Sequence, residues 1–282
     1  MKQGFVKVAS ATPRIRVADP VYNAQVICEQ AKEAAEHGAK IVVFPELCIT
    51  GYTCNDLFLQ ELLLEKAKEA LLTIAEETGQ LETLFLVGLP VDKDGRLYNV
   101  AAVLYRGRIL GMIPKKNIPM YAEFYEGRHF TPGEETVTEY RLGKQVIPFG
   151  SNLLFRCEEL PELILGCELC EDLWVAEPPS TSHALMGATV IANLSASNET
   201  VSKDDYRTLL IKASSARLLC GYIYTSAGEG ESTQDLVFGG HDLIAENGTL
   251  LVQSARFTTG ILYTDLDLSL IHISEPTRPI SI

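Results

Sequence analysis

The chain has 282 residues, 46% of them apolar, and carries a formal net charge of −13 at pH 7 with its histidines neutral. The acidic balance excludes nucleic acid as an expected partner, and we find neither a run of ~18 apolar residues nor the apolar core of a signal peptide, so no membrane is expected. Seven cysteines without the dense, regular spacing of a disulfide scaffold favour a reducing compartment, and we expect a cytoplasmic protein.

The first third of the chain alternates strand and helix patterns. Apolar residues run together or recur at three- and four-residue spacing, which predicts strands over residues 5–10, 39–44 and 84–89 and helices over 21–35 and 64–74. Pro45 ends the second strand and leaves Glu46 just beyond its carboxyl end, as a first candidate base. We therefore expect an α/β protein with a largely parallel sheet and a substantial core.

The pattern then changes. Two apolar runs joined through Arg106-Gly107 predict an antiparallel hairpin over residues 97–113. From Pro114 to Gly133 the chain is polar, aromatic and proline-bounded, and a loop of about 20 residues in a compact domain is usually functional. Further strands are expected over 153–155, 163–170, 188–193 and 221–225, helical residues over 184–187 and 203–219, and a closing hairpin around Asn247-Gly248.

Residues 269–282 follow neither a helix period nor a strand period and contain two prolines. We see no linker before them, so the prediction is one domain over residues 1–268 followed by a tail that is not part of the fold. We interpret such a tail as a disordered or non-native extension, for example a cloning scar.

The strand over 163–170 ends in a thiol, Cys170, which is flanked by carboxylates and would lie at the sheet edge where α/β folds place their ligands. A free thiol with a pKa of roughly 8.5 is mostly protonated at neutral pH and needs a base or a cation before it can attack. Glu46, Lys115 and Cys170 come from separate strand ends or loops and fit an amide-cleaving site. The carboxylate would take the thiol proton and pass it to leaving ammonia, and the ammonium would stabilise negative charge on oxygen.

Three segments around these residues carry a resemblance to a known family. They are Val-Val-Phe-Pro-Glu46-Leu-Cys-Ile-Thr-Gly-Tyr52, Ile-Pro-Lys115 and Cys170-Glu-Asp-Leu-Trp174. On them the chain resembles the nitrilase (carbon-nitrogen hydrolase) superfamily, whose triad is Glu, Lys and Cys. The resemblance implies a four-layer αββα sandwich, with two sheets between layers of helices, and a homo-oligomer.

Within that superfamily, segments 51–58, 115–128 and 193–197 resemble the glutaminase domain of glutamine-dependent NAD⁺ synthetase. This likeness implies hydrolysis of glutamine to glutamate and ammonia, which passes to a second, ATP-using domain. It also implies that Glu126 is an auxiliary glutamate beside the lysine and that Tyr121, Ser197 and Lys203 help to bind glutamine. Relatives often have arginine at the position of Lys203.

One motif of that family is missing. Neither a Ser-Gly-Gly-x-Asp-Ser pyrophosphatase loop nor another Gly-rich phosphate loop appears in the sequence. The synthesis of NAD⁺, with its ATP and Mg²⁺, would then belong to an absent synthetase domain or to a separate subunit. The glutaminase step itself is expected to need no cofactor and no metal.

Other interpretations have less support. Cys167-Glu-Leu-Cys170 fits C-x-x-C, but a zinc site usually needs a second comparable pair, and redox pairs begin helices rather than lie in strands. A Ser-His-Asp hydrolase lacks its G-x-S-x-G elbow. A stand-alone amidase acting on another ω-amide and a non-catalytic scaffold both stay open. Since residues three apart on a strand face opposite sides, we choose Cys170 as the nucleophile and Cys167 as core packing.

Overall fold

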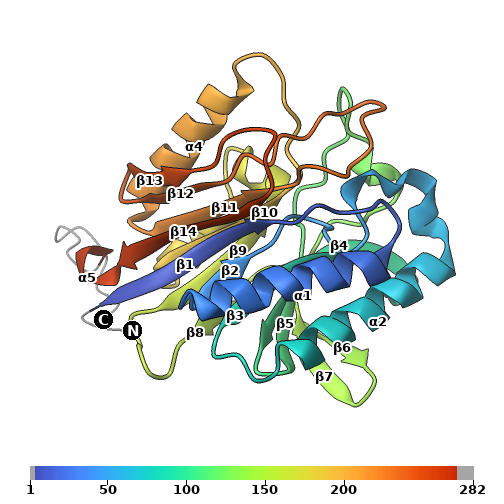
Figure 1. Ribbon diagram of the computed structural model, residues 1–282, viewed down its shortest axis with the longest axis horizontal. Helices are drawn as coiled ribbons and strands as arrows, with labels where there is room; N and C mark the ends of the chain where they lie inside the picture. The colour runs from blue at the N-terminus through green and yellow to red at the C-terminus, as the bar shows by residue number, and fades with distance from the viewer. Residues whose placement is uncertain (1–3, 272–282) are drawn as a thin grey trace.

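The structure, a computed structural model, describes residues 4–271 (Figure 1). Within this range the strands form two sheets, of eight and six strands. The larger sheet contains β1 (Phe5–Thr12), β2 (Ile41–Val43), β3 (Leu84–Lys93), β4 (Arg96–Tyr105), β5 (Arg108–Pro114), β6 (Thr138–Leu142), β7 (Gln145–Phe149) and β14 (Gly260–Asp267). The smaller sheet contains β8 (Leu154–Arg156), β9 (Ile164–Leu169), β10 (Val190–Ser195), β11 (Gly221–Ser226), β12 (Leu243–Glu246) and β13 (Thr249–Gln253). The α-helices are α1 (Pro20–Glu36), α2 (Glu61–Glu77), α3 (Pro179–Leu185), α4 (Lys203–Leu218) and α5 (Leu268–Ile271), and the 3₁₀ segments are η1 (Tyr52–Leu59), η2 (Glu126–Arg128) and η3 (Cys170–Leu173).

Both sheets are mixed rather than largely parallel. The larger has the order β14-β1-β2-β3-β4-β5-β7-β6, with β1, β2 and β3 parallel, and the smaller has the order β13-β12-β11-β10-β9-β8, with β9, β10 and β11 parallel. Tight turns return the chain directly into antiparallel pairs: Asp94, Gly95, Arg106 and Gly107 all have positive φ, as in type I′ hairpins. The hairpin at Arg106-Gly107 is thus confirmed, and the expectation of a largely parallel sheet is wrong.

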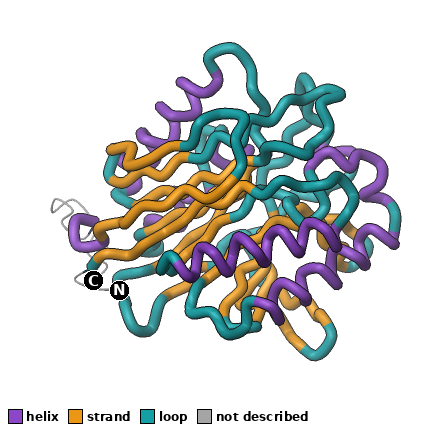
Figure 2. The backbone as a smooth tube through the Cα atoms, viewed as in Figure 1, coloured by secondary structure: helices purple, strands orange, loops and turns teal. Residues whose placement is uncertain are grey.

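The sheets pack face to face and form the expected four-layer αββα sandwich. Val8 and Val103 of the larger sheet meet Cys167 and Ile223 of the smaller in an apolar layer, and all four are fully buried. Helices α1 and α2 cover the outer face of the larger sheet, where they lie side by side, and α4 covers that of the smaller (Figure 2). In the part of the chain that the structure describes, no helix is long and apolar enough to cross a membrane.

Local chemistry explains where α1 begins and ends. Asp19 precedes the helix, and its carboxylate accepts a hydrogen bond from Tyr22 N at 3.1 Å. Pro20 occupies the first helical position, where an N–H would have no partner within the helix. Gly38 follows the end of the helix with a φ of 84°, which a residue without a Cβ adopts freely. These signals lie within a few residues of the helix and could be predicted from sequence.

The boundary expected after residue 268 falls inside α5. Leu268 and Ile271 are buried against the layer between the sheets, with 1% exposure each, and Leu268 N donates to Gly4 O at 3.0 Å. Residues 269–271 of the expected tail therefore belong to the fold. The remainder of that tail, 272–282, lies outside the described residues.

Candidate active site

Three strand ends converge on a buried site between the sheets. Glu46 lies just beyond β2 and Lys115 directly follows β5, both in the larger sheet, whereas Cys170 directly follows β9 in the smaller. Glu46 and Lys115 are fully buried, and the exposed fraction of Cys170 is 6%. The charge of Glu46 raises the pKa of the Cys170 thiol and the charge of Lys115 lowers it, so both groups lie within electrostatic range of the sulfur. The structure thus brings the three predicted residues to one place.

Glu46 is held by three donors. Its Oε1 accepts hydrogen bonds from Lys115 Nζ and Asn99 Nδ2, both at 2.7 Å, and its Oε2 accepts one from Ala196 N at 2.9 Å. Ala196 follows β10, so this last bond joins the smaller sheet to the larger. Burial raises the pKa of Glu46 to about 7, and the neighbouring Lys115 opposes the rise. A carboxyl group with this pKa can accept and release a proton near neutral pH, as a general base must.

Lys115 lies between two carboxylates. Its Nζ donates to Glu46 Oε1 at 2.7 Å and to Glu126 Oε1 at 2.6 Å. Burial lowers the pKa of Lys115, but the charges of Glu126 and Glu46 outweigh burial and hold it well above its usual range. The ammonium therefore keeps its charge at neutral pH. Tyr52 OH donates to Glu126 Oε1 at 2.8 Å and so fixes the second carboxylate.

Cys170 begins a turn and is not part of the strand. It is the first residue of η3, directly after Leu169, and has a φ of 41°. Positive φ is uncommon for a residue with a Cβ, and such strain clusters at functional sites. Burial and the Glu46 charge raise the pKa of the thiol, while Lys115 lowers it, so the resting thiol is protonated. Among residues 4–271, no three His, Cys, Asp or Glu side chains are placed to hold a metal ion. The two cysteines of the C-x-x-C pattern, Cys167 and Cys170, therefore have no third metal ligand in this part of the chain.

Asp172 connects the Cys170 turn to the segment after Lys115, and it was not among the residues predicted from the sequence. Its Oδ2 accepts from Leu169 N at 3.0 Å, and its Oδ1 accepts from Asn117 N and Asn117 Nδ2, both at 2.8 Å. One buried carboxylate therefore binds both chain segments that carry the thiol and the ammonium. The available sequence signal was its place within the Cys170-Glu-Asp-Leu-Trp174 segment.

A cation, a carboxylate and aromatic rings gather beside Cys170. Tyr121 OH donates to Glu171 Oε2 at 2.9 Å, and the Tyr121 ring contacts Phe124 with 5.8 Å between centroids. Lys203 Nζ lies 5.5 Å from the centroid of the same Phe124 ring. Burial raises the pKa of Glu171, and Tyr121, Lys115 and Lys203 oppose that rise. Two predicted binding residues, Tyr121 and Lys203, therefore lie together, and Glu171 is a charged neighbour that the sequence analysis missed.

Ser197 lies near the site but has partners within the protein. Its exposed fraction is 2%, its Oγ accepts from Arg207 Nη2 at 3.3 Å, and its N donates to Ser226 Oγ at 3.2 Å. It directly follows Ala196, whose N–H binds Glu46. The backbone of Ser197 therefore lies at the site, and its hydroxyl is bound by the buried guanidinium of Arg207.

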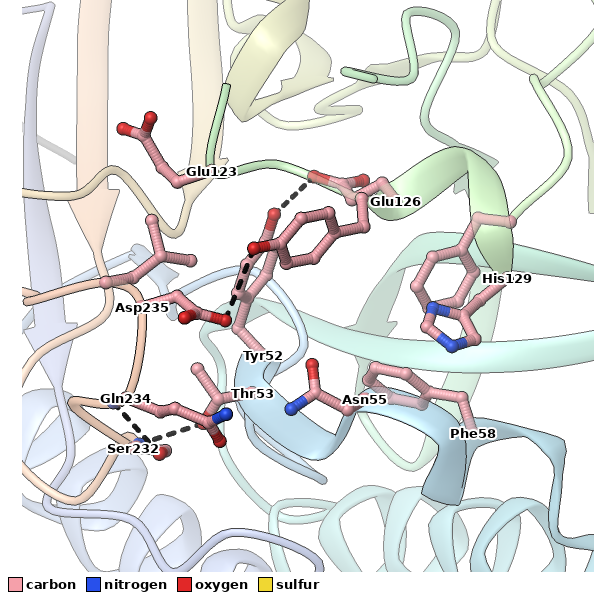
Figure 3. A pocket seen from close by; sticks show the side chains of 13 residues that line it. Tyr52, Thr53, Asn55, Phe58, Glu123, Glu126, His129, Ser232, Gln234 and Asp235 are labelled. Carbon is pink, nitrogen blue, oxygen red and sulfur yellow. Dashed lines mark hydrogen bonds between the residues drawn. The ribbon is translucent and has the colours of Figure 1, made fainter. Parts of the chain in front are cut away.

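A pocket adjoins the site at Tyr52 and Glu126 (Figure 3). Its walls come from the segments 52–58, 123–130 and 232–236, which are far apart in the sequence. Tyr125 OH donates to Asp235 Oδ2 at 3.3 Å, and this bond joins two of the three segments. Because Glu126 lines the pocket and also binds Lys115, it forms part of the wall between the pocket and the buried ammonium.

A buried carboxylate, ammonium and thiol at strand ends in an αββα sandwich define a site of the nitrilase type. Comparison with protein families agrees with this geometry: the model described as "Carbon-nitrogen hydrolase" matches residues 7–272. The chain belongs to the carbon-nitrogen hydrolase family.

Individual relatives point to a more particular group. The glutamine-dependent NAD(+) synthetase of Mycobacterium tuberculosis is 42% identical over 279 residues, which are 98% of this chain and 41% of that protein. The crystal structure of a glutamine-dependent NAD(+) synthetase from Cytophaga hutchinsonii superimposes with a TM-score of 0.84 at 28% identity, covering 93% of this chain and 43% of that one. An amidase from Nesterenkonia sp. shares the fold, with a TM-score of 0.74 at 20% identity over 98% of this chain and 95% of its own. The chain thus spans less than half the length of the synthetases it matches.

Proposed function

We propose that the chain hydrolyses the side-chain amide of glutamine to glutamate and ammonia, with Cys170 as the nucleophile, Glu46 as the general base and Lys115 as the oxyanion stabiliser. The observation that carries this proposal is the buried contact of Lys115 with Glu46 and Glu126 next to a thiol on a strained turn. The likeness to glutamine-dependent synthetases supports glutamine as the substrate.

The chemistry follows from the protonation states. Glu46 takes the proton of Cys170 as Sγ attacks the amide carbon, and the electron pair of the C=O bond moves to oxygen, where Lys115 stabilises the negative charge. The C–N bond then breaks, and Glu46 delivers the proton to the leaving ammonia. Water next attacks the thioester; Glu46 takes its proton and returns it to the thiol, which releases glutamate. Glu126, beside Lys115, keeps the ammonium charged and in place through this cycle.

The charges beside Cys170 suit a free amino acid. The ammonium of Lys203 can bind an α-carboxylate, and the carboxylate of Glu171 can bind an α-ammonium. Tyr121, which touches both Phe124 and Glu171, would close this subsite, and Ser197 would contribute from the segment after β10. A zwitterion fits this pair of charges better than a neutral amide does, which favours glutamine over simple aliphatic amides.

The ammonia would supply NAD⁺ synthesis from deamido-NAD⁺ on a synthetase domain or subunit outside these residues. The synthetases that the chain matches extend well beyond the matched region, which supports this partnership. ATP and Mg²⁺ would belong to that partner, and the glutaminase step needs no cofactor because the chain's own residues supply base, nucleophile and charge. A homo-oligomer in the cytoplasm remains our prediction.

Ammonia release by the purified chain tests the proposal. We expect turnover of glutamine above that of asparagine and of short aliphatic amides, and none by Cys170→Ala. If glutamine is not cleaved but another ω-amide is, the chain is a stand-alone amidase. If no amide is cleaved and an electrophilic glutamine analogue does not label Cys170, the chain is a non-catalytic scaffold.

A further inference from the structure

The 3₁₀ segment η1 starts without a capping side chain of its own. Its N-cap residue is Gly51, which has no side chain to accept a hydrogen bond, so the first N–H groups, those of Tyr52 and Thr53, need partners from elsewhere. Glu231 supplies them from a distant loop: Oε1 accepts from Tyr52 N at 2.6 Å, and Oε2 accepts from Thr53 N at 3.0 Å and from Thr53 Oγ1 at 2.6 Å. One carboxylate therefore satisfies three donors.

The loop that carries Glu231 is itself fixed in place. Gly230 has a φ of 107°, and a Cβ at this position would lie 1.9 Å from Ile15 O, so glycine lets the loop pass against that carbonyl. Ser232 N donates to Thr53 Oγ1 at 2.9 Å, which joins the loop to η1 a second time (Figure 3). Glu231 thus holds η1 from a loop that packs against Ile15 and is bonded to η1 through Ser232 as well.

Tyr52, whose backbone N–H binds Glu231, is linked through its side chain and Glu126 to the buried Lys115. Tyr52 OH donates to Glu126 Oε1 at 2.8 Å, and the same oxygen accepts from Lys115 Nζ at 2.6 Å. A shift of the Tyr52 backbone would move its hydroxyl away from Glu126 and would loosen the carboxylate that positions the ammonium. Displacements of about 1 Å in such supporting contacts can cost up to roughly 100-fold in rate.

We propose that Glu231 is a positioning residue, which places Tyr52 and, through its hydroxyl, Glu126 and Lys115. This inference rests on the proposed glutaminase reaction. Glu231 does not touch the group formed by Tyr121, Glu171 and Lys203, so it should affect the turnover number and leave substrate binding unchanged.

A double-mutant cycle with Tyr52→Phe tests the inference in the full chain. Glu231→Gln replaces one acceptor oxygen by an NH₂ group, which meets either Tyr52 N or the two donors of Thr53 and so disturbs the start of η1 in both orientations. We expect kcat to fall about 10-fold with KM within about 2-fold of wild type. In the Tyr52→Phe background, the same change should lower kcat less than about 2-fold, because the hydroxyl through which it acts is already gone. Glu229→Gln is the matched control: this exposed carboxylate of the same loop pairs with Arg14 at 3.0 Å, and its loss should leave kcat unchanged.

Equal losses in both backgrounds, a change confined to KM, or no loss at all would overturn the inference. If Glu231→Gln does not fold, Thr53→Val removes one of the three donors, and we expect a loss of about 3-fold that also disappears with Tyr52→Phe. A Thr53→Val variant at wild-type kcat would equally overturn it.

A second readout separates this inference from the proposed function. Alkylation of Cys170 by iodoacetamide, followed against pH with Cys170→Ala as the blank, needs no amide substrate but depends on the charge of Lys115 near the thiol. Glu231→Gln should shift the pH profile of alkylation upward, and Tyr52→Phe should abolish the difference. If this shift is seen while the wild type releases no ammonia, the proposed function is wrong and the positioning role holds. If ammonia is released and Glu231→Gln has the same effect with and without Tyr52→Phe, on kcat and on the pH profile of alkylation alike, the positioning role is wrong.

Discussion

Replacing the general base by its amide, Glu46→Gln, tests the assignment of the proton carrier. Glutamine has nearly the same shape, but its side chain cannot take the proton of Cys170. Positioned general bases contribute roughly 10²- to 10⁴-fold, so we expect kcat to fall by at least ~10². The new NH₂ group would face either Ala196 N or the two donors Lys115 and Asn99, and this donor conflict should cost about 1–3 kcal/mol of stability.

The pH dependence makes this prediction sharper. Burial raises the pKa of Glu46 from 4.5 to about 7, and the active form is the carboxylate, so kcat/KM of the wild type should rise with pH up to about 7 and be lost progressively below it. Lys115 stays protonated over this range, because its pKa lies well above the usual value. Ammonia release measured from pH 5 to 9 should therefore show an inflection near 7 in the wild type that is missing from Glu46→Gln. A Glu46→Gln variant that keeps both the rate and the inflection would refute the assignment.

Four further substitutions probe the site. Lys115→Ala should lower ammonia release at least ~10²-fold with the fold retained, and turnover close to wild type would remove the ammonium from the mechanism. Cys170→Ala should abolish ammonia release and labelling by a diazo-ketone analogue of glutamine, whereas Cys167→Ala should keep both and lower Tm by about 2–4 °C through the lost core volume; the reverse pattern would contradict our choice of nucleophile. Lys203→Ala should raise KM for glutamine roughly 10-fold or more and change kcat less, as steady-state kinetics will reveal, and an unchanged KM would take Lys203 out of the subsite.

Local patterns predicted much of the framework. The hairpin at Arg106-Gly107 follows from turn chemistry that acts over a few residues, and the helix expected over 21–35 agrees with α1 to within one residue at each end. By contrast, β14 was missed, although it pairs with β1 over that strand's whole length. Most of its residues are only partly buried and show weak alternation, and they form a strand because they pair with the opposite end of the chain.

The same division runs through the site. The sequence by itself determined the segments that carry Glu46, Lys115 and Cys170, because each follows an apolar strand and lies in a motif that can be read locally. Only the tertiary structure decided what surrounds them: the donors Asn99 and Ala196 on Glu46, the positive φ of the thiol-bearing turn, and the link from Glu231 to η1. The physical reason is that pKa values and side-chain positions depend on burial and on charges within a few ångströms, and the packing of two sheets brings these groups together from residues as far apart in sequence as 46 and 196.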